Sequence, residues 1–238
     1  YFSDYNFYID PVCFDAGISI GQAYYHSKNP KPMKNFYVGL REESYKLDGL
    51  DYKRVSYSDV ADILCAGEIV ALFQGKSEAG QRALGNRSLL FDPRADNGRD
   101  IVNQIKQRES FRPFAGTVLL EDVDEWFDMR GLKECEYMQY AVKVKKSGID
   151  AVTHVDNTCR VQTITKKQNK HFYNLIKAFK QKTKVPILLN TSFNLGGEPL
   201  VETFDDAIKT LNKSNINYLY LPEIGKLVYC FKLTFPDN

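Results

Sequence analysis

The stretch Ile69-Val70-Ala71-Leu72-Phe73-Gln74-Gly75-Lys76-Ser77-Glu78-Ala79-Gly80-Gln81-Arg82-Ala83-Leu84-Gly85-Asn86-Arg87-Ser88-Leu89-Leu90-Phe91 places two apolar runs on either side of a basic segment that contains three glycines. Apolar runs of this length are short enough to be buried strands. The pattern predicts a strand over 69–73, a loop over 75–87 and a second strand over 88–91.

The remainder of the chain carries a mixture of strand and helix signals. Further strands are expected at 118–120, 141–144, 160–164, 185–189, 218–221 and 226–231. Helices are expected from an N-cap at Ser58 to Gly67, over 97–106, over 170–182, and from the capping box that Thr203 and Asp206 form. Because the strands and helices follow no regular βαβ order, the predicted fold class is α+β.

The first part of the chain differs from the rest. Residues 15–24 read as a short turn that leads into a helix of small residues, and the prolines at 30 and 32 close that helix. A polar connector follows. We expect residues 1–35 to be the end of a preceding domain, 36–55 to be a linker and 56–238 to be the main domain. Since the chain begins on Tyr1 rather than Met, we expect it to be part of a longer protein.

Composition excludes several classes of protein. Aromatic residues make up 13% and hydrophobic residues 43% of the 238 residues, which argues against disorder. There is no run of about 18 apolar residues, so no membrane span is expected. A net charge of +2 is too small to require a nucleic-acid partner. The five cysteines are scattered without a C-x-x-C motif, which favours a reduced compartment, and we expect a cytoplasmic protein.

The segment from Lys76 to Arg112 contains eight basic residues, six of them arginine, against five acidic ones. Guanidinium groups give planar pairs of donors that suit phosphate oxygens, and nearby glycines let backbone amides approach an anion. A solvated basic surface explains the same composition equally well. The Gly75-Lys76-Ser77 triplet is not the end of a P-loop, because that motif needs glycine where Val70 stands.

Lys106 and Arg108 are the next candidate ligands for an anion. Two residues apart, they share a face only in an extended segment, so the preceding helix must end before them if they bind one ligand. Ser192 and Asn194 stand where a strand is expected to meet a loop, and both offer small polar groups. An ordinary polar turn is the alternative for this second pair.

A third cluster contains His154 and Asp156, followed by Arg160 and Gln162. At strand spacing, the members of each pair share a face. The His-x-Asp pair could bind a metal ion, but a single histidine is available nearby, so substrate positioning is favoured over metal binding.

Together these motifs resemble the signature of the NodU/CmcH family of carbamoyltransferases. The resemblance rests on residues 75–88, Asp92-Pro93-Arg94, 106–115, His154-Val155-Asp156 and Asn190-Thr191-Ser192-Phe193-Asn194, followed by Gly197-Glu198-Pro199. The motifs occur in the family's order and cover roughly residues 60–222. A match of this length and order is not a chance event.

The resemblance implies a two-domain enzyme. Its C-terminal domain is YrdC-like, with a mixed, twisted sheet and flanking helices, and it converts ATP and carbamoyl phosphate into carbamoyl-adenylate. The N-terminal, actin-like domain then transfers the carbamoyl group to a hydroxyl acceptor of small-molecule type. Iron or another divalent metal belongs to that N-terminal domain, and Mg²⁺ accompanies the ATP. Neither nucleic acid nor membrane is an expected partner.

The resemblance also assigns residue roles. Lys106, Arg108, Ser192 and Asn194 match the YrdC-like pattern and are expected to be catalytic. The expected substrate-binding residues are Arg82, Arg87, Arg112, His154, Asp156, Arg160, Gln162 and Thr191. Asp15 matches a metal-binding aspartate of the transfer domain, and its histidine partners are expected upstream of this chain.

Two other functions fit part of the pattern. A threonylcarbamoyl-adenylate synthase of tRNA modification shares the Lys-x-Arg and Ser-x-Asn elements, but is not expected to carry the segment from Arg82 to Arg94. A nucleotide-binding module without catalysis is the second alternative. The identity of the final acceptor is not encoded in these motifs.

Overall fold

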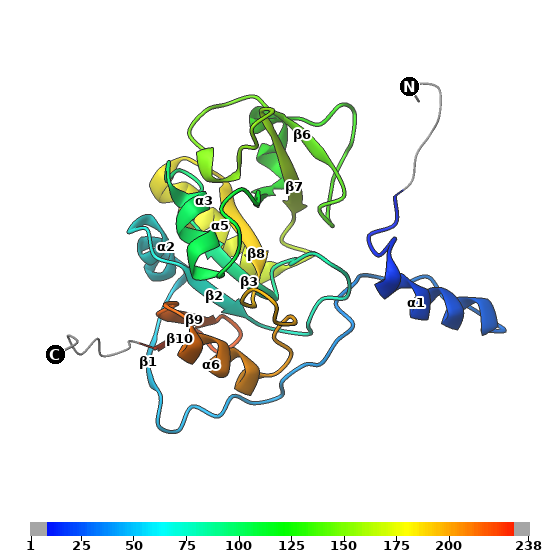
Figure 1. Cartoon of the computed structure of the whole chain (residues 1–238), viewed down its shortest axis with the longest axis horizontal. Coiled ribbons are helices and arrows are strands. Elements are labelled where there is room, and N and C mark those ends of the chain that lie inside the picture. Colours follow the sequence, from blue (N-terminus) through cyan, green and yellow to red (C-terminus); the bar gives the residue numbers. More distant parts are fainter. Residues whose placement is uncertain (1–8, 231–238) are drawn as a thin grey trace.

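The computed structural model describes residues 9–230 as an α+β fold built on one sheet (Figure 1). The ten strands of the described residues lie in the order β1-β10-β9-β2-β3-β8-β4-β7-β6-β5. Neighbouring strands are antiparallel except for the pairs β2–β9 and β4–β7, which are parallel. The predicted α+β class is confirmed. Residues 1–8 of the predicted N-terminal segment, Phe231 of the last predicted strand and residues 232–238 lie outside the described residues.

The strands are β1 (Asp51–Arg54), β2 (Val70–Phe73), β3 (Arg87–Phe91), β4 (Ala115–Leu119), β5 (Phe127–Asp128), β6 (Ala141–Val144), β7 (Thr158–Ile164), β8 (Ile187–Ser192), β9 (Tyr218–Leu221) and β10 (Lys226–Tyr229). The α-helices are α1 (Asp15–His26), α2 (Tyr57–Cys65), α3 (Gly98–Ile105), α4 (Val123–Trp126), α5 (Lys170–Thr183) and α6 (Phe204–Lys213). Two short 3₁₀ helices, η1 (Leu120–Asp122) and η2 (Asp150–Val152), complete the list.

The predicted helices and most strands are confirmed, with two local corrections. Ser56, rather than Ser58, is the N-cap of α2, because it forms a reciprocal capping box with Asp59 that satisfies backbone donors on both sides. Strand β8 extends through Ser192, so the Asn190-Thr191-Ser192 segment is part of the sheet instead of a loop. Pairing with β3 on one side extends the strand, since Ser192 lies opposite Ser88.

The expected linker is integrated into the fold. Residues 51–54 form β1, the edge strand that pairs with β10. Earlier in the same segment, Arg41 forms an isolated bridge with Lys76, and Tyr45 packs against the core. Part of the segment expected to be a linker is therefore paired with, and packed against, the main domain. We call residues 36–47 the strap, because they lie along the outside of the loop between β2 and β3.

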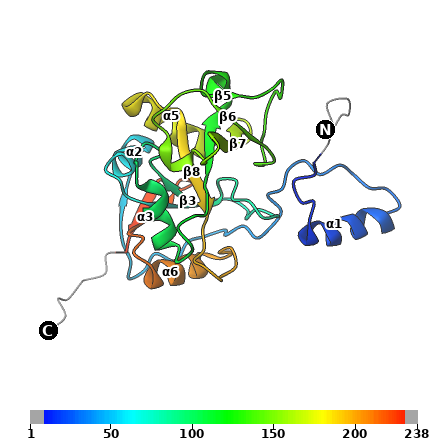
Figure 2. The same cartoon turned by 45° about the horizontal axis from the view of Figure 1, so that its top comes forward.

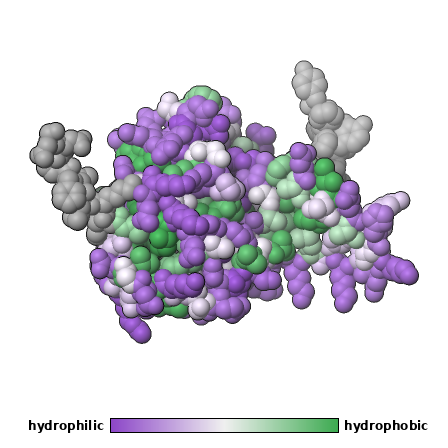
Figure 3. Space-filling model, turned by 60° about the horizontal axis from the view of Figure 1, so that its bottom comes forward, coloured by the Kyte–Doolittle hydropathy of each residue, from purple (hydrophilic) through white to green (hydrophobic). Residues whose placement is uncertain are grey.

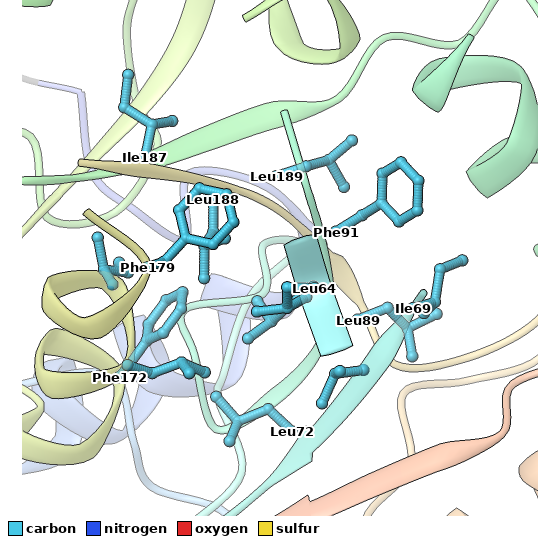
Figure 4. Packing of buried hydrophobic residues seen from close by; sticks show 14 of the residues in the cluster. Leu64, Ile69, Leu72, Leu89, Phe91, Phe172, Phe179, Ile187, Leu188 and Leu189 are labelled. Atoms are coloured by element: carbon cyan, nitrogen blue, oxygen red, sulfur yellow. The ribbon is translucent and has the colours of Figure 1, made fainter. Parts of the chain in front are cut away.

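The core lies where β2, β3 and β8 meet helices α2 and α5, which pack against each other (Figure 4). Leu64 of α2 and Phe172 and Phe179 of α5 are completely buried there. On the strands, Leu72 and Leu89 are also completely buried. Burying apolar side chains of this size contributes roughly 1.5–3 kcal/mol each, and this packing fixes the central strands that carry the site.

The helix α1 lies to one side of this body (Figures 1 and 2). It contains no buried residue, and Ile18 and Tyr25 are exposed. The chain just before it contacts the body through Val12, which is buried, and through a hydrogen bond from Gln139 to the carbonyl of Ile9. Hydrophilic and hydrophobic side chains are mixed over the surface in Figure 3. Within residues 9–230, no helix has both the length and the apolar character needed to cross a bilayer.

Gly85 is a position where both the backbone and the core require glycine. Its φ is +102°, and a Cβ there would lie 2.2 Å from Cδ1 of Phe172. We expect Gly85→Ala to lower the free energy of unfolding by about 2–5 kcal/mol, from backbone strain together with overpacking. Gly67→Ala is the matched control, since φ is +81° but nothing lies within 4 Å of its Cβ. Urea unfolding of both variants measures the difference. Equal losses would show that Phe172 moves aside without cost.

Candidate anion-binding site

The end of α3 places two cations beside each other. The helix ends at Ile105, Lys106 is its C-cap, and Gln107 has a positive φ of 53°. The amide of Arg108 then donates to the carbonyl of Asn103 at 3.1 Å. This turn meets the condition stated from the sequence, that the helix must end before Lys106 and Arg108 if both are to face one ligand.

The ammonium of Lys106 joins the end of α3 to the end of β8. Its Nζ donates to the carbonyls of Ser192 at 2.5 Å and Asn194 at 2.8 Å, and lies 3.0 Å from Oδ1 of Asn194. The hydroxyl of Ser192 donates to the same Oδ1 at 2.7 Å. Lys106 is only 2% exposed. Burial, with a smaller contribution from the charge of Arg108, lowers the pKa of Lys106 to about 7.

The guanidinium of Arg108 is held from two sides. Its Nε donates to Oδ1 of Asn103 at 2.6 Å, and its Cζ lies 4.4 Å from the centre of the Phe114 ring. Burial, followed by the charge of Arg112, lowers the pKa of Arg108 to about 10. A side chain anchored in this way presents its remaining donors in a fixed orientation.

These residues surround an open cavity of about 750 Å³. Its lining includes Lys106, Arg108, Arg112, Ser192, Asn194 and the glycines at 196 and 197. The amide of Gly196 donates to the carbonyl of Lys106 at 2.7 Å, which pins the loop after β8 to the end of α3. Glu109 is the one acidic residue among the lining residues that the structure describes, and it pairs with Arg112 at 2.8 Å. The four residues expected to be catalytic therefore converge on one cavity.

Two further arginines stand on elements that neighbour this cavity, although neither is among its described lining residues. Arg160 stands on β7, opposite Ala115 of β4. The segment that carries Arg82 lies beside the same strands, because the carbonyl of Leu84 accepts from Gln162 of β7 and that of Ala83 accepts from Asn190, which pairs with Ala115. Burial, then the charges of Arg82 and Arg108, lowers the pKa of Arg160 to about 10. No described residue accepts a hydrogen bond from the buried Nε of Arg160. We call Arg82, Arg108 and Arg160 the arginine cluster.

Arg87 is not available to a ligand, contrary to the sequence prediction. It is completely buried, and its guanidinium donates to backbone carbonyls of Gln74, Gly75, Asn86, Leu40 and Glu202 at 2.6–3.4 Å. Its Cζ lies 3.7 Å from the centre of the Phe73 ring. The side chain is turned inward because Arg87 begins strand β3 opposite Phe73. It is a structural residue that ties the strap to the loop.

Gln162 is also engaged by the protein itself, and Thr191 faces away from the cavity. The Gln162 side chain accepts from Thr117 and Asn190 and donates to the carbonyl of Leu84. Thr191 alternates with Ser192 along β8, so its side chain points to the opposite face of the sheet from the Lys106 contacts. Neither residue is placed to bind a ligand in the cavity.

His154 and Asp156 lie in a turn before β7 instead of in a strand. His154 contacts the carbonyl of Phe114 at 3.1 Å, and Asp156 accepts from the hydroxyl and amide of Thr158. These contacts close the turn. The pair lines a separate hollow of about 290 Å³ beside Phe114. Asp156 is exposed, and the hydrogen bonds from Thr158 lower its pKa.

Metal ligands are not gathered among residues 9–230, where no group of three or more His, Cys, Asp or Glu side chains could hold an ion. Asp15, at the first turn of α1, is exposed and has no such neighbours in the described part of the chain. Its metal-binding role remains a prediction about a longer protein.

Some contributors to the site were not identified from the sequence. Asn103 orients Arg108 from within a helix, and Phe114 supplies the ring beneath it. An asparagine one turn before the Lys-x-Arg pair was the available signal for Asn103. The close approach of Gly196 to the carbonyls of residues 106 and 107 depends on tertiary structure and has no local signal.

Comparison with known proteins identifies the family. Residues 61–226 match the family described as "Carbamoyltransferase C-terminus". Nodulation protein NolO of Bradyrhizobium diazoefficiens is 38% identical over 234 residues, covering 89% of this chain and 43% of NolO. A 3'-hydroxymethylcephem-O-carbamoyltransferase of Streptomyces clavuligerus is 34% identical over 196 residues, covering 82% of this chain and 34% of that enzyme. The chain thus spans less than half the length of these relatives.

Among solved structures, full-length HypF in its phosphate- and nucleotide-bound form matches with a TM-score of 0.47 and 18% identity, covering 68% of this chain and 21% of HypF. The resemblance to NodU/CmcH carbamoyltransferases that the motifs indicated is confirmed by the sequence matches. This chain belongs to the carbamoyltransferase C-terminal family.

Proposed function

We propose that this chain binds ATP and carbamoyl phosphate and forms carbamoyl-adenylate, for O-carbamoylation of a hydroxyl acceptor by another part of a longer protein. The match to the carbamoyltransferase C-terminus supports the reaction class. Since the chain spans 34% of the Streptomyces clavuligerus carbamoyltransferase, we assign the transfer step to the remaining part.

The observation that carries this proposal is the uncompensated positive charge at the cavity. Lys106 has its acceptors within the protein. Glu109, the one carboxylate among the described lining residues, pairs with Arg112, and no described ion pair joins an acid to the arginine cluster. The charge of Arg112 lowers the pKa of Arg108, and the charges of Arg82 and Arg108 lower that of Arg160. Such repulsion between like charges is unfavourable until an anion neutralises them. Several guanidinium groups around one cavity suit a ligand with several phosphate oxygens.

The proposed reaction needs positioning and charge neutralisation more than a protein nucleophile. Water first cleaves the bond between the phosphate and the carbamoyl group of carbamoyl phosphate, which releases inorganic phosphate and carbamate. A carbamate oxygen then attacks the α-phosphorus of ATP, and the bond from that phosphorus to the bridging oxygen breaks, so that pyrophosphate leaves. Arg108 and Arg160 stabilise the negative charge on the phosphate oxygens, and Lys106 holds Ser192 and Asn194 in place beside them. Mg²⁺ would be held mainly by phosphate oxygens and water, since the described lining offers no carboxylate cage.

Isotope exchange tests the proposal directly. We expect the chain to exchange labelled pyrophosphate into ATP when carbamoyl phosphate is present, and to carbamoylate no hydroxyl acceptor by itself. Exchange that requires threonine and bicarbonate instead would identify a threonylcarbamoyl-adenylate synthase. ATP binding without exchange under any of these conditions would indicate a nucleotide-binding module and contradict the proposal.

Lys106 makes anion binding pH-dependent. Its pKa in the free protein is lowered to about 7, so its charge is present below that pH and is lost as the pH rises through it. Sulfate keeps a charge of −2 over this range. We expect sulfate affinity to fall by up to about tenfold per pH unit above pH 7, as measured by calorimetry between pH 6 and 9. Lys106→Met should bind more weakly with a flat profile. A steep profile in that variant would assign the titration to another group.

Arg108→Lys tests the role of the planar guanidinium. The substitution keeps the charge but loses the paired donors and the contact with Phe114, so we expect pyrophosphate exchange to fall by roughly 10²-fold, about 2.7 kcal/mol. Arg54→Lys on the exposed edge strand β1 is the matched control and should keep full activity. Initial exchange rates are compared beside thermal melts. Equal rates for both variants would remove Arg108 from the reaction, and a large drop in melting temperature would make it a structural residue.

A further inference from the structure

The loop between β2 and β3 is cross-linked by one buried carboxylate. Glu78 is 7% exposed, and its Oε1 accepts hydrogen bonds from the amides of Leu84 at 2.9 Å, Asn86 at 2.7 Å and Arg87 at 3.1 Å. No described residue donates to its buried Oε2. The carboxylate therefore ties residue 78, in the outgoing limb of the loop, to residues 84–87, which form the returning limb.

The returning limb is also held on its carbonyl side. The carbonyl of Leu84 accepts from the hydroxyl of Tyr37 at 2.9 Å and from Gln162 at 3.1 Å. The carbonyl of Ala83 accepts from Asn190 at 3.2 Å. The returning limb is also joined to the beginning of the loop by Asn86, which donates to the carbonyl of Lys76 at 2.7 Å. Glu78 is the contact nearest to residues 79–83, since it binds the amides of residues 84, 86 and 87 directly.

Between the two limbs lies a five-residue arc, 79–83, which carries Arg82. The arc contains Gly80 with a φ of +97°, and a Cβ at this glycine would lie 2.9 Å from Cγ1 of Val12. An arc of this kind loses little conformational freedom unless its two ends are fixed relative to each other. Glu78 joins the two ends of the arc directly, while Asn190 and Gln162 hold its last residues against the sheet. The position of Arg82 therefore depends on Glu78 for the first of these constraints.

The three hydrogen bonds to Glu78 depend on the length of its side chain, while its charge acts on Arg87, whose pKa it raises against the effect of burial. One oxygen receives all three amides, and the second oxygen makes no described hydrogen bond. The nearby guanidinium of Arg87 donates to backbone carbonyls and does not contact the carboxylate in any described hydrogen bond or ion pair. An amide oxygen at the same place can accept the same three bonds.

We propose that Glu78 is a positioning residue that holds Arg82 within the arginine cluster, so that Arg82 binds a phosphate group of the substrate. The proposal rests on the function proposed above for the statement that the cluster binds phosphate. Glu78 acts through the backbone of residues 84–87 and does not touch the ligand.

Two substitutions separate the effect of side-chain length from the effect of charge. Glu78→Gln keeps the length and the accepting oxygen but removes the charge, whereas Glu78→Asp keeps the charge and is one methylene too short. Inorganic pyrophosphate is the probe, titrated by calorimetry into the full 238-residue chain. We expect Glu78→Asp to weaken pyrophosphate binding about tenfold, because the charge-assisted contact with Arg82 would be lost. The affinity of Glu78→Gln should stay within about threefold of that of the original chain. Glu43→Ala on the exposed part of the strap is the control.

A double-mutant cycle shows whether the effect passes through Arg82. If it does, Arg82→Ala combined with Glu78→Asp binds pyrophosphate no more weakly than Arg82→Ala alone. Losses that add in the double variant would overturn the proposal, because Glu78 would then act elsewhere. Glu78→Gln as weak as Glu78→Asp would overturn it too, since charge would be the requirement.

Amide hydrogen exchange gives a readout that needs no ligand. Protection of the Leu84, Asn86 and Arg87 amides should be lost in Glu78→Asp and kept in Glu78→Gln. Unchanged protection in Glu78→Asp would overturn the proposal. If the original chain does not exchange pyrophosphate into ATP, the proposed adenylation is contradicted instead. Amide protection and the double-mutant cycle of pyrophosphate binding would still decide the role of Glu78.

Discussion

The buried guanidinium of Arg87 is the interaction on which the arrangement of the site depends. A charge removed from water is costly unless its donors find acceptors. Here Nη1 and Nη2 donate to backbone carbonyls from the strap, the β2–β3 loop and the approach to α6, while Nε has no described acceptor. Three segments far apart in the sequence are thereby held together. The loop that carries Arg82 begins and ends beside Arg87, which holds its two ends close, and Glu78 fixes the segment between them.

A second buried cation performs the same task on the other side of the cavity. Lys106 joins the end of α3 to the end of β8, across 86 and 88 residues of chain, through the carbonyls of Ser192 and Asn194. The two structural cations receive their acceptors from the protein. In the arginine cluster, Arg108 is held by Asn103, but the guanidinium groups of Arg82 and Arg160 make no described hydrogen bond or ion pair. Nε of Arg87 also lacks a described acceptor, but its Nη1 and Nη2 are held by backbone carbonyls. This contrast supports the anionic ligand proposed above.

The strap is bound along the β2–β3 loop, which carries Arg82. Backbone amides and carbonyls of residues 36–40 pair with residues 77 and 79, and Glu202 accepts from both the amide of Leu40 and the hydroxyl of Ser77. A segment with the composition of a linker is thus bound into the domain. The helix α1, which contributes no buried residue, depends on the same region through Val12 and the tip of the β2–β3 loop. The chain before the strap and the loop that carries Arg82 are therefore in direct contact.

The sequence by itself determined most of the local elements and the family. Apolar runs and capping residues located most helices and strands, and the Lys106-Gln107-Arg108 spacing required the helix end that the structure shows. These are properties of neighbouring residues, so they can be read without knowing the fold. The α+β class and the family followed from the same local patterns in their order.

Only the tertiary structure decided which of the similar side chains serve the site. Arg82 and Arg87 belong to one motif, yet one is part of the arginine cluster and the other is buried among carbonyls. Arg160 and Gln162 share a face of β7, yet Gln162 is occupied by Thr117, Asn190 and Leu84. The strap and β1 gained their places from partners in distant parts of the chain. The physical reason is that burial and hydrogen-bond partners are long-range properties: a residue's type states what it can bind, and the fold decides whether that capacity is already used.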